Sequence, residues 1–140
     1  MASTSMIINI PKNIKGKVVV ASSPSEFHEI GAWIISDILE SNGWDVKYLG
    51  ANTPKKDLIS LLSSFKPNVL ALSVTMPFNI LKTKDVIDTI KKDENLKNIS
   101  IIVGGSAFNQ TKELWRSTGA DLYARNLLEA KELLNNLEIL

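Results

Sequence analysis

The chain has 140 residues, a length that fits one domain of ordinary size. Its 16 basic and 15 acidic residues leave a net charge of +1, which gives no electrostatic reason to expect nucleic acid or an anionic membrane as a partner. The lack of cysteine excludes disulfides, thiolate metal sites and cysteine nucleophiles. With no signal peptide and no apolar stretch of membrane-spanning length, we expect a cytoplasmic protein with a flexible segment at 1–15 and one domain at 16–140.

Short apolar runs alternate with amphipathic stretches along the first half of the chain. The run at 17–21 (KVVVA) predicts a buried parallel strand. Apolar residues at helical spacing then predict a helix that ends near Asn42 and is closed by Gly43. A second strand is expected at 45–49, followed by a helix with Thr53 as its N-cap and Pro54 in its first position.

The same alternation continues through the second half of the chain. Apolar runs predict strands at 69–73 (VLALS), 100–103 and 122–124. Helices are expected at about 79–92 and at 110–117. A last helix follows the fifth strand, and the side chain of Asn126 is placed to cap it.

Strict alternation of strands and helices predicts the fold class. It indicates an α/β domain with a parallel, doubly wound sheet and helices on both faces. Five strands favour the flavodoxin-like, Rossmann-like order 2-1-3-4-5. In that order, ligands bind beyond the carboxyl ends of strands one and three, where the winding reverses. The loops after residues 21, 73 and 103 are therefore the candidate site.

Three familiar uses of this fold can be tested against these loops. A phospho-receiver domain needs acidic residues at the ends of the first and third strands, where this chain has Ser22 and Ser73. A dinucleotide-binding fold needs a GxGxxG turn after the first strand, but no glycine lies between Gly16 and Gly31. The serines after the first strand satisfy half of a flavin phosphate loop, so flavin binding stays open.

Three short motifs lie on these loops. In chain order they are Glu26-Phe27-His28-Glu29-Ile30-Gly31, Ser73-Val74-Thr75 and Gly104-Gly105-Ser106. Together they resemble the DxHxxG, SxL and GG motifs of the cobalamin (vitamin B12)-binding domain family, at that family's spacing. The chain departs from the family pattern at Glu26, where aspartate is usual, and at Thr75, where leucine is usual. The glutamate variant is most similar to the sensory branch, which includes photoreceptors.

The resemblance implies a cobalamin whose dimethylbenzimidazole tail leaves the cobalt and enters the cleft. A histidine then becomes the lower axial ligand; the only histidine is His28, and neutral imidazole binds transition metals well. Glu26 would hold the other ring nitrogen of His28. The cofactor is adenosylcobalamin or methylcobalamin. The other residues expected to contact it are Ser25, Phe27, Glu29, Ile30, Gly31, Ser73, Val74, Thr75, Gly104, Gly105 and Ser106.

Each of these residues also has a structural interpretation that the sequence leaves open. His28 could be satisfied within a loop or at a helix start, and Glu26 could be a solvated residue in a first helical turn. Ser73 could bond to backbone at the end of a strand. Gly104 and Gly105 could form a plain turn.

The resemblance implies a cofactor-binding module with no turnover of its own. We expect it to bind cobalamin base-off and His-on, as a sensory or light-sensing domain or as a corrinoid carrier. One alternative is the small cobalamin-binding subunit of an adenosylcobalamin-dependent mutase, and another is a degenerate domain that acts only in protein interaction. A capping domain, a partner protein or a second copy of the chain would cover the upper face of the corrin. We expect no direct binding of nucleic acid and no membrane contact.

Overall fold

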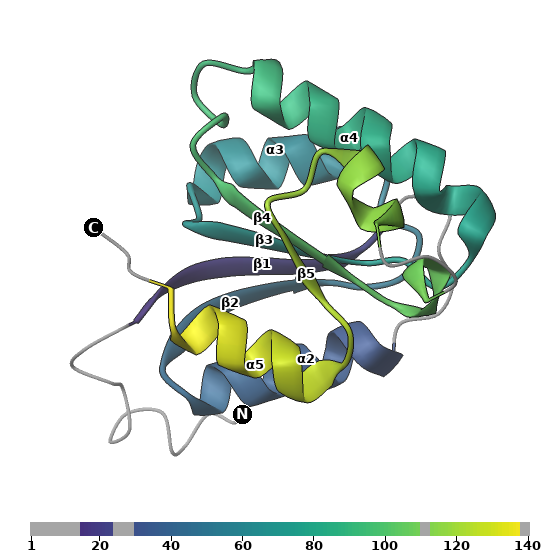
Figure 1. Cartoon of the computed structure of the whole chain (residues 1–140). Helices are drawn as coiled ribbons and strands as arrows, with labels where there is room; N and C mark the ends of the chain where they lie inside the picture. Colours follow the sequence, from purple (N-terminus) through teal and green to yellow (C-terminus); the bar gives the residue numbers. More distant parts are fainter. Residues whose placement is uncertain (1–14, 24–29, 110–112, 138–140) are drawn as a thin grey trace.

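The structure, a computed structural model, describes residues 15–23, 30–109 and 113–137. Five parallel strands form one sheet in the order β2-β1-β3-β4-β5, which confirms the predicted flavodoxin-like fold (Figure 1). Apart from Lys15, the segment expected to be flexible lies outside the described residues. The strands are β1 (Gly16–Ser22), β2 (Trp44–Leu49), β3 (Val69–Ser73), β4 (Ser100–Gly104) and β5 (Leu122–Ala124).

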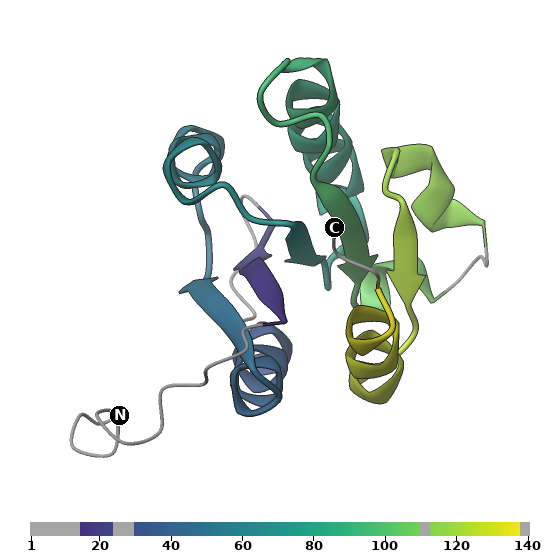
Figure 2. The same cartoon turned by 90° about the vertical axis from the view of Figure 1, so that its left-hand side faces the viewer.

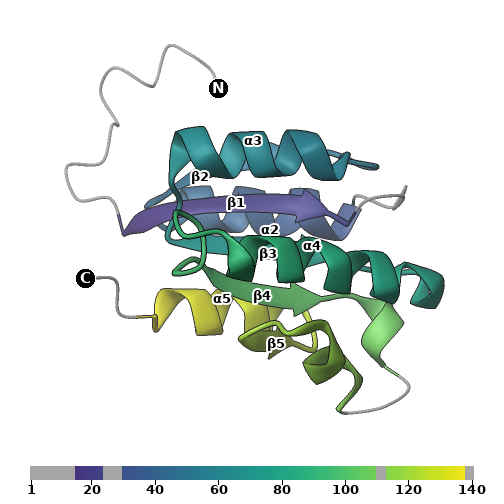
Figure 3. The same cartoon turned by 90° about the horizontal axis from the view of Figure 1, so that it is seen from above.

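Helices cover both faces of the sheet, so the described residues form three layers (Figure 2). Helices α2 (Ile30–Ser41) and α5 (Leu127–Asn135) lie on one face, and α3 (Lys55–Phe65) and α4 (Ile80–Lys92) lie on the other (Figures 1 and 3). Within the described ranges, no helix is long and apolar enough to cross a membrane. The short 3-10 turns are η1 (Pro77–Asn79), η2 (Ser106–Phe108) and η3 (Leu114–Thr118).

Alternation of side chains along the strands divides the core into two halves. Val19 and Ala21 of β1 belong to the half under α3 and α4, whereas Val18 and Val20 belong to the half under α2 and α5. The first half is filled by large aliphatic side chains, which the helices contribute at helical spacing: Leu58, Leu62, Val86, Ile87 and Ile90. In this half of the core, α3 and α4 pack closely against the sheet.

Most helix ends follow their sequence cues. Gly43 follows α2 with a φ of 94°, and the Asn126 side chain caps α5, both as predicted. The predicted start of α3 was wrong by one residue, because Pro54 and not Thr53 is the N-cap. The Thr53 hydroxyl donates instead to the carbonyl of Gly50 at 2.9 Å and stabilises the turn before the helix.

The helix expected at 110–117 is the main error among the predicted elements. Residues 110–112 lie outside the described ranges, and Leu114–Thr118 form the 3-10 turns of η3. The hydroxyls of Ser117 and Thr118 donate to carbonyls three residues back, at 2.7 and 2.6 Å. Such local side-chain bonds compete with the longer hydrogen bonds of an α-helix.

The pairing of β3 with β4 continues past the end of the sheet. The Val74 N–H donates to the Gly104 carbonyl at 2.8 Å, and the Ser106 hydroxyl donates to the Thr75 carbonyl at 3.2 Å. Gly105 lies between these bonds with a φ of 114°, and a Cβ there would overlap the Val74 carbonyl. The two loops therefore form one unit that only glycine at 105 permits.

A buried pair of hydroxyls ties the end of β1 to α4. Ser23 Oγ and Thr83 Oγ1 lie 2.7 Å apart, and both residues are fully buried. The Thr83 hydroxyl donates to the Asn79 carbonyl at 2.9 Å, and because a hydroxyl has one proton, Ser23 must donate to Thr83. The Ser23 N–H also donates to the Ser73 carbonyl at 3.0 Å, which holds the residue after β1 against the end of β3.

The Gly105 contact yields a test in the protein without cofactor. Gly105→Ala forces a Cβ into the Val74 carbonyl at a positive φ, so we expect a loss of stability of about 1–3 kcal/mol or more. Gly31→Ala is the matched control, because among the described residues no atom outside its own helix backbone and chain neighbours lies within 4 Å of a Cβ there, and the position is inside α2. It should be neutral or stabilising by up to about 1 kcal/mol. Urea unfolding measures both variants, and equal losses would contradict the assigned clash.

The direction of the Ser23–Thr83 hydrogen bond yields a second test. Thr83→Val leaves the Ser23 hydroxyl buried without its acceptor, which should cost about 1–3 kcal/mol. Ser23→Ala leaves Thr83 bonded to the Asn79 carbonyl and should cost less. The double variant buries neither hydroxyl and should recover part of the Thr83→Val loss. Urea unfolding of the three variants decides, and a larger loss for Ser23→Ala would reverse the assigned donor.

Candidate functional site

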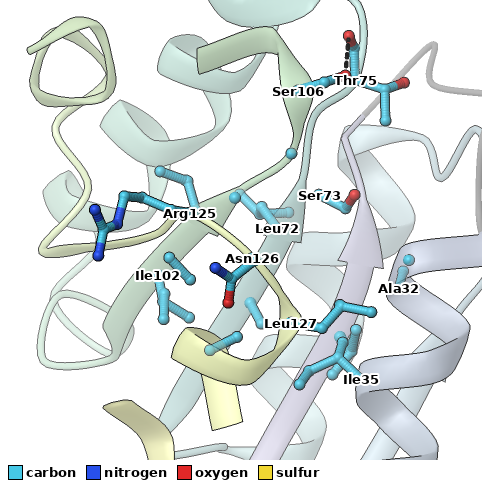
Figure 4. Close-up of a pocket in the computed structure, with 18 of the residues that line it drawn as sticks. Ala32, Ile35, Leu72, Ser73, Thr75, Ile102, Ser106, Arg125, Asn126 and Leu127 are labelled. Atoms are coloured by element: carbon cyan, nitrogen blue, oxygen red, sulfur yellow. Dashed lines mark hydrogen bonds between the residues drawn. The ribbon is translucent and has the colours of Figure 1, made fainter. Parts of the chain in front are cut away.

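Strands β1 and β3 are neighbours in the sheet, but the chain leaves them toward opposite faces. Helix α2 follows β1 on one face, and α4 follows β3 on the other. Because α2 and α4 lie on opposite faces, a space is left between them at the carboxyl edge of the sheet. A cavity of about 610 Å³ lies there, lined by strands β1, β3, β4 and β5 and by helices α2 and α5 (Figure 4). Its volume lies within the roughly 300–1,000 Å³ of small-molecule sites.

Small side chains keep this cavity open. Ala32 on α2, Ala71 on β3 and Ala124 at the end of β5 all line it. Strand β3 is the central strand of the sheet, where full burial is usual. Val69 is buried there, but Ala71 and Ser73 on the same face are only partly buried. The cavity thus reaches down along the centre of the sheet.

The corner between β5 and α5 forms one wall of the cavity. Asn126 lines the cavity (Figure 4). Its Oδ1 accepts a hydrogen bond from the Glu129 N–H at 2.8 Å. The Arg125 guanidinium donates to Glu129 Oε2 through Nε at 3.0 Å and Nη2 at 2.9 Å. These bonds lower the pKa of Glu129 and raise that of Arg125, so both groups are charged at neutral pH. The charged pair and the cap fix the position of this corner.

The structure brings together the described parts of the three predicted motifs. The residues of these motifs that line the cavity are Gly31, Ser73, Thr75, Gly104, Gly105 and Ser106. Val74 does not line it: its side chain is fully buried in the core under α3 and α4, because side chains alternate along an extended chain. The remaining predicted residues lie outside the described ranges: Ser25, Glu26, Phe27, His28, Glu29 and the side chain of Ile30.

Sequence reasoning missed the helical walls and the β5–α5 corner. Ile35, Leu127 and Leu134 line the cavity, although their helical spacing indicated only a core-facing stripe. Asn126 was predicted as a cap and not as a cavity residue. A usable signal was the pair of small residues at the start of α2, Gly31 and Ala32, opposite a strand that carries Ala71.

Comparison with known proteins agrees with this geometry. The chain matches the model of the B12 binding domain over residues 16–131. It is 31% identical over 124 residues to dimethylamine corrinoid protein 1 of Methanosarcina acetivorans, an alignment that covers 85% of this chain and 57% of that protein. It is 30% identical to dimethylamine corrinoid protein 3 of Methanosarcina mazei, covering 85% of this chain and 72% of that protein. The chain thus spans little more than half the length of the first of these relatives.

Solved structures show the same fold. A cobalamin-binding protein from Desulfitobacterium hafniense superposes with a TM-score of 0.79 at 21% identity, covering 86% of this chain and 58% of that one. The methanol:cobalamin methyltransferase complex of Methanosarcina barkeri gives 0.77 at 21% identity, covering 95% and 52%. A response regulator receiver domain from Bermanella marisrubri gives 0.64 at 18% identity, covering 89% and 98%. Because the family model matches most of its length, this chain belongs to the B12-binding domain family.

Proposed function

We propose that the chain is the cobalamin-carrying module of a methyl-transfer system. The nucleotide tail of the cofactor occupies the cavity, and His28 is the lower axial ligand of the cobalt. The observation that carries this proposal is the cavity itself, which opens at the switch point of the sheet and is lined by Ser73, Gly104 and Gly105. When bound, the cofactor supplies a cobalt centre that accepts and gives up a methyl group. The module has no turnover of its own.

The residues around the cavity suit a long, partly aromatic tail. At Gly104 a Cβ would lie 3.1 Å from the Ala124 carbonyl oxygen, so the main chain there is open to close approach by a ligand. Ser73 offers a hydroxyl at the end of the central strand. Further in, Val20 and Ala71 offer apolar surface against which an aromatic ring can pack.

Described residues on both sides of the segment 24–29, which contains His28, lie at or next to this cavity. Ser23, before the segment, is fixed by hydrogen bonds to Ser73 and Thr83, and Gly31, after it, lines the cavity. His28 is the only histidine in the sequence, so only it can supply an imidazole ligand. Glu26, bonded to the other ring nitrogen, would fix the tautomer and make the ligand more basic.

The relatives favour a carrier over the other functions that the motifs allow. The curated relatives at 30–31% identity are dimethylamine corrinoid proteins, and one of the similar structures is a methyltransferase complex. Light sensing is supported only by the glutamate variant of the first motif. No specific residue favours the alternative function as a subunit of an adenosylcobalamin-dependent mutase.

An apolar rim around the cavity supports a covering partner. The large hydrophobic side chains that stand exposed among the described residues are Trp33, Phe78, Leu81, Leu127 and Leu128, with exposed fractions of 36–76%. Phe78 lies in η1, just before α4, and the other four lie in the first turns of α2, α4 and α5. Because all five strands are parallel, these turns lie at the carboxyl edge, where the cavity also opens. A capping domain, a methyltransferase or a second copy of the chain covers this edge and the upper side of the corrin.

Axial ligation by His28 can be tested by electron paramagnetic resonance. The cobalt(II) holoprotein should show splitting from one axial nitrogen, and nitrogen-15 labelling of the protein should change that splitting. His28→Ala should abolish the labelled coupling and weaken binding. Glu26→Gln should keep the coupling but weaken ligation, by about 10–100-fold if it behaves as other outer-shell carboxylates do. A wild-type spectrum insensitive to protein labelling would show that the cofactor's own base is the ligand.

The carrier and light-sensing functions can be separated by illumination. For a carrier we expect methylcobalamin to bind at least as tightly as adenosylcobalamin. We also expect no change in association state when the adenosylcobalamin-loaded protein is exposed to green light. Sedimentation velocity in darkness and after illumination measures the association state. The control is His28→Ala, which differs from the wild type only at the proposed cobalt ligand. A light-driven change in sedimentation, with a preference for adenosylcobalamin, would favour the sensor.

A further inference from the structure

The strand register places the residues of the cavity in successive levels. Val20 of β1, Ala71 of β3 and Ile102 of β4 are in register with one another and form one level. Ser73 and Gly104 form the next level toward the carboxyl edge. The residues beyond the strand ends form the mouth. The level of Val20, Ala71 and Ile102 is called here the cavity floor, and its strand residues present only hydrocarbon side chains.

The helices add little polarity to the floor. Ile35 of α2 and Leu134 of α5 line the cavity from that side and are also hydrocarbon. Polar side chains do line the cavity, but Thr75, Ser106 and Asn109 follow the ends of β3 and β4 and so belong to the mouth.

Three further polar side chains line the cavity: Ser73, Arg125 and Asn126. The Arg125 guanidinium donates to the Glu129 carboxylate through Nε and Nη2, so Ser73 and Asn126 remain for a ligand that enters the cavity. Ser73 lies one level above the floor. Its hydroxyl can donate a hydrogen bond through its O–H and can accept one at an oxygen lone pair. Asn126 uses one lone pair of its Oδ1 to cap α5, and its amide nitrogen carries two donors. A single acceptor nitrogen can therefore be met by the Ser73 hydroxyl, whereas the side chains of the floor itself offer neither a donor nor an acceptor.

We infer that the cavity floor selects among corrinoids by the polarity of the tail base. It accepts benzimidazole and phenol tails and discriminates against purine tails. This inference rests on the proposed function, because it requires the tail to enter the cavity. An adenine base brings several ring nitrogens and an exocyclic amino group, all of which lose water on entry. A dimethylbenzimidazole has one free ring nitrogen, which Ser73 can meet, and p-cresol has no nitrogen at all.

The energetic reason is the cost of a buried polar group without a partner. Each such group costs on the order of a 10-fold loss of affinity or more. The amino group of adenine needs an acceptor, and the floor residues Val20, Ala71 and Ile102 provide none. Apolar rings of similar area lose nothing on entry and gain packing against these side chains.

Binding of four methylated corrinoids to the wild-type protein tests the inference. They carry dimethylbenzimidazole, p-cresol, adenine or no base at all, the last being cobinamide. The decisive pair is p-cresolyl against adeninyl cobamide, because p-cresol cannot coordinate cobalt and adenine releases cobalt readily, so neither affinity is masked by loss of an internal ligand. We expect the p-cresolyl form to bind about 10-fold more tightly or better. Equal or tighter binding of the adeninyl form would overturn the inference.

Binding of cobinamide distinguishes a failure of the selectivity inference from a failure of the proposed function. If the tail enters the cavity, p-cresolyl cobamide binds more tightly than cobinamide, and Ser73→Leu reduces that difference by blocking the path. If cobinamide binds as tightly as p-cresolyl cobamide in the wild type, the tail is outside the cavity and the proposed binding mode fails first.

A variant of the floor gives the second arm of the test. Ala71→Ser adds one hydroxyl to the floor and should reduce the preference for p-cresolyl over adeninyl cobamide. Ala120→Ser is the matched control, since Ala120 packs against the other half of the core and should leave the ratio unchanged. Circular dichroism confirms that both variants fold. A ratio that moves equally in the two variants, or in neither, would contradict selection by the floor.

Discussion

Two hydrogen-bonded neighbours, β1 and β3, lead to helices on opposite faces of the sheet, and the rest of the site depends on this divergence. It opens the carboxyl edge at the middle of the sheet without any special residue, because helices that follow neighbouring strands on opposite faces leave the space between them uncovered. The side chains determine how deep the cavity is. Ala71 and Ser73 on the central strand are too small to fill it, and the hydrogen-bonded loops after β3 and β4 form its wall at the mouth.

The two faces of the sheet have different tasks. Under α3 and α4, large aliphatic side chains such as Leu62 and Ile87 are fully buried and belong to the larger of the two hydrophobic clusters. Under α2 and α5, small side chains such as Ala32 line the cavity beside a smaller buried cluster that includes Leu39. One half of the core is thus closely filled, and the other half is partly open.

The carboxyl edge carries the exposed apolar side chains together with the Arg125–Glu129 ion pair, and the Lys91–Asp121 pair lies at the opposite end of the strands. Ion pairs as exposed as these are worth little to stability. A net charge of +1 also leaves no broad field to attract a charged ligand. In the proposed function, recognition of both cofactor and partner would rest on shape and apolar contact at the carboxyl edge.

Local patterns in the sequence were sufficient for the strand order and for the family. Alternating apolar runs and helical spacing set a parallel sheet, and motif residues such as Ser73 and Gly105 follow the strands that the order places side by side. Tertiary structure alone decided which neighbours face the cavity, because Val74 turns into the core while the chain around it lines the site. It also decided the wall at Asn126 and the 3-10 form of Leu114–Thr118. The shape of the cavity depends on side chains from segments far apart in the sequence, so no local sequence pattern predicts it.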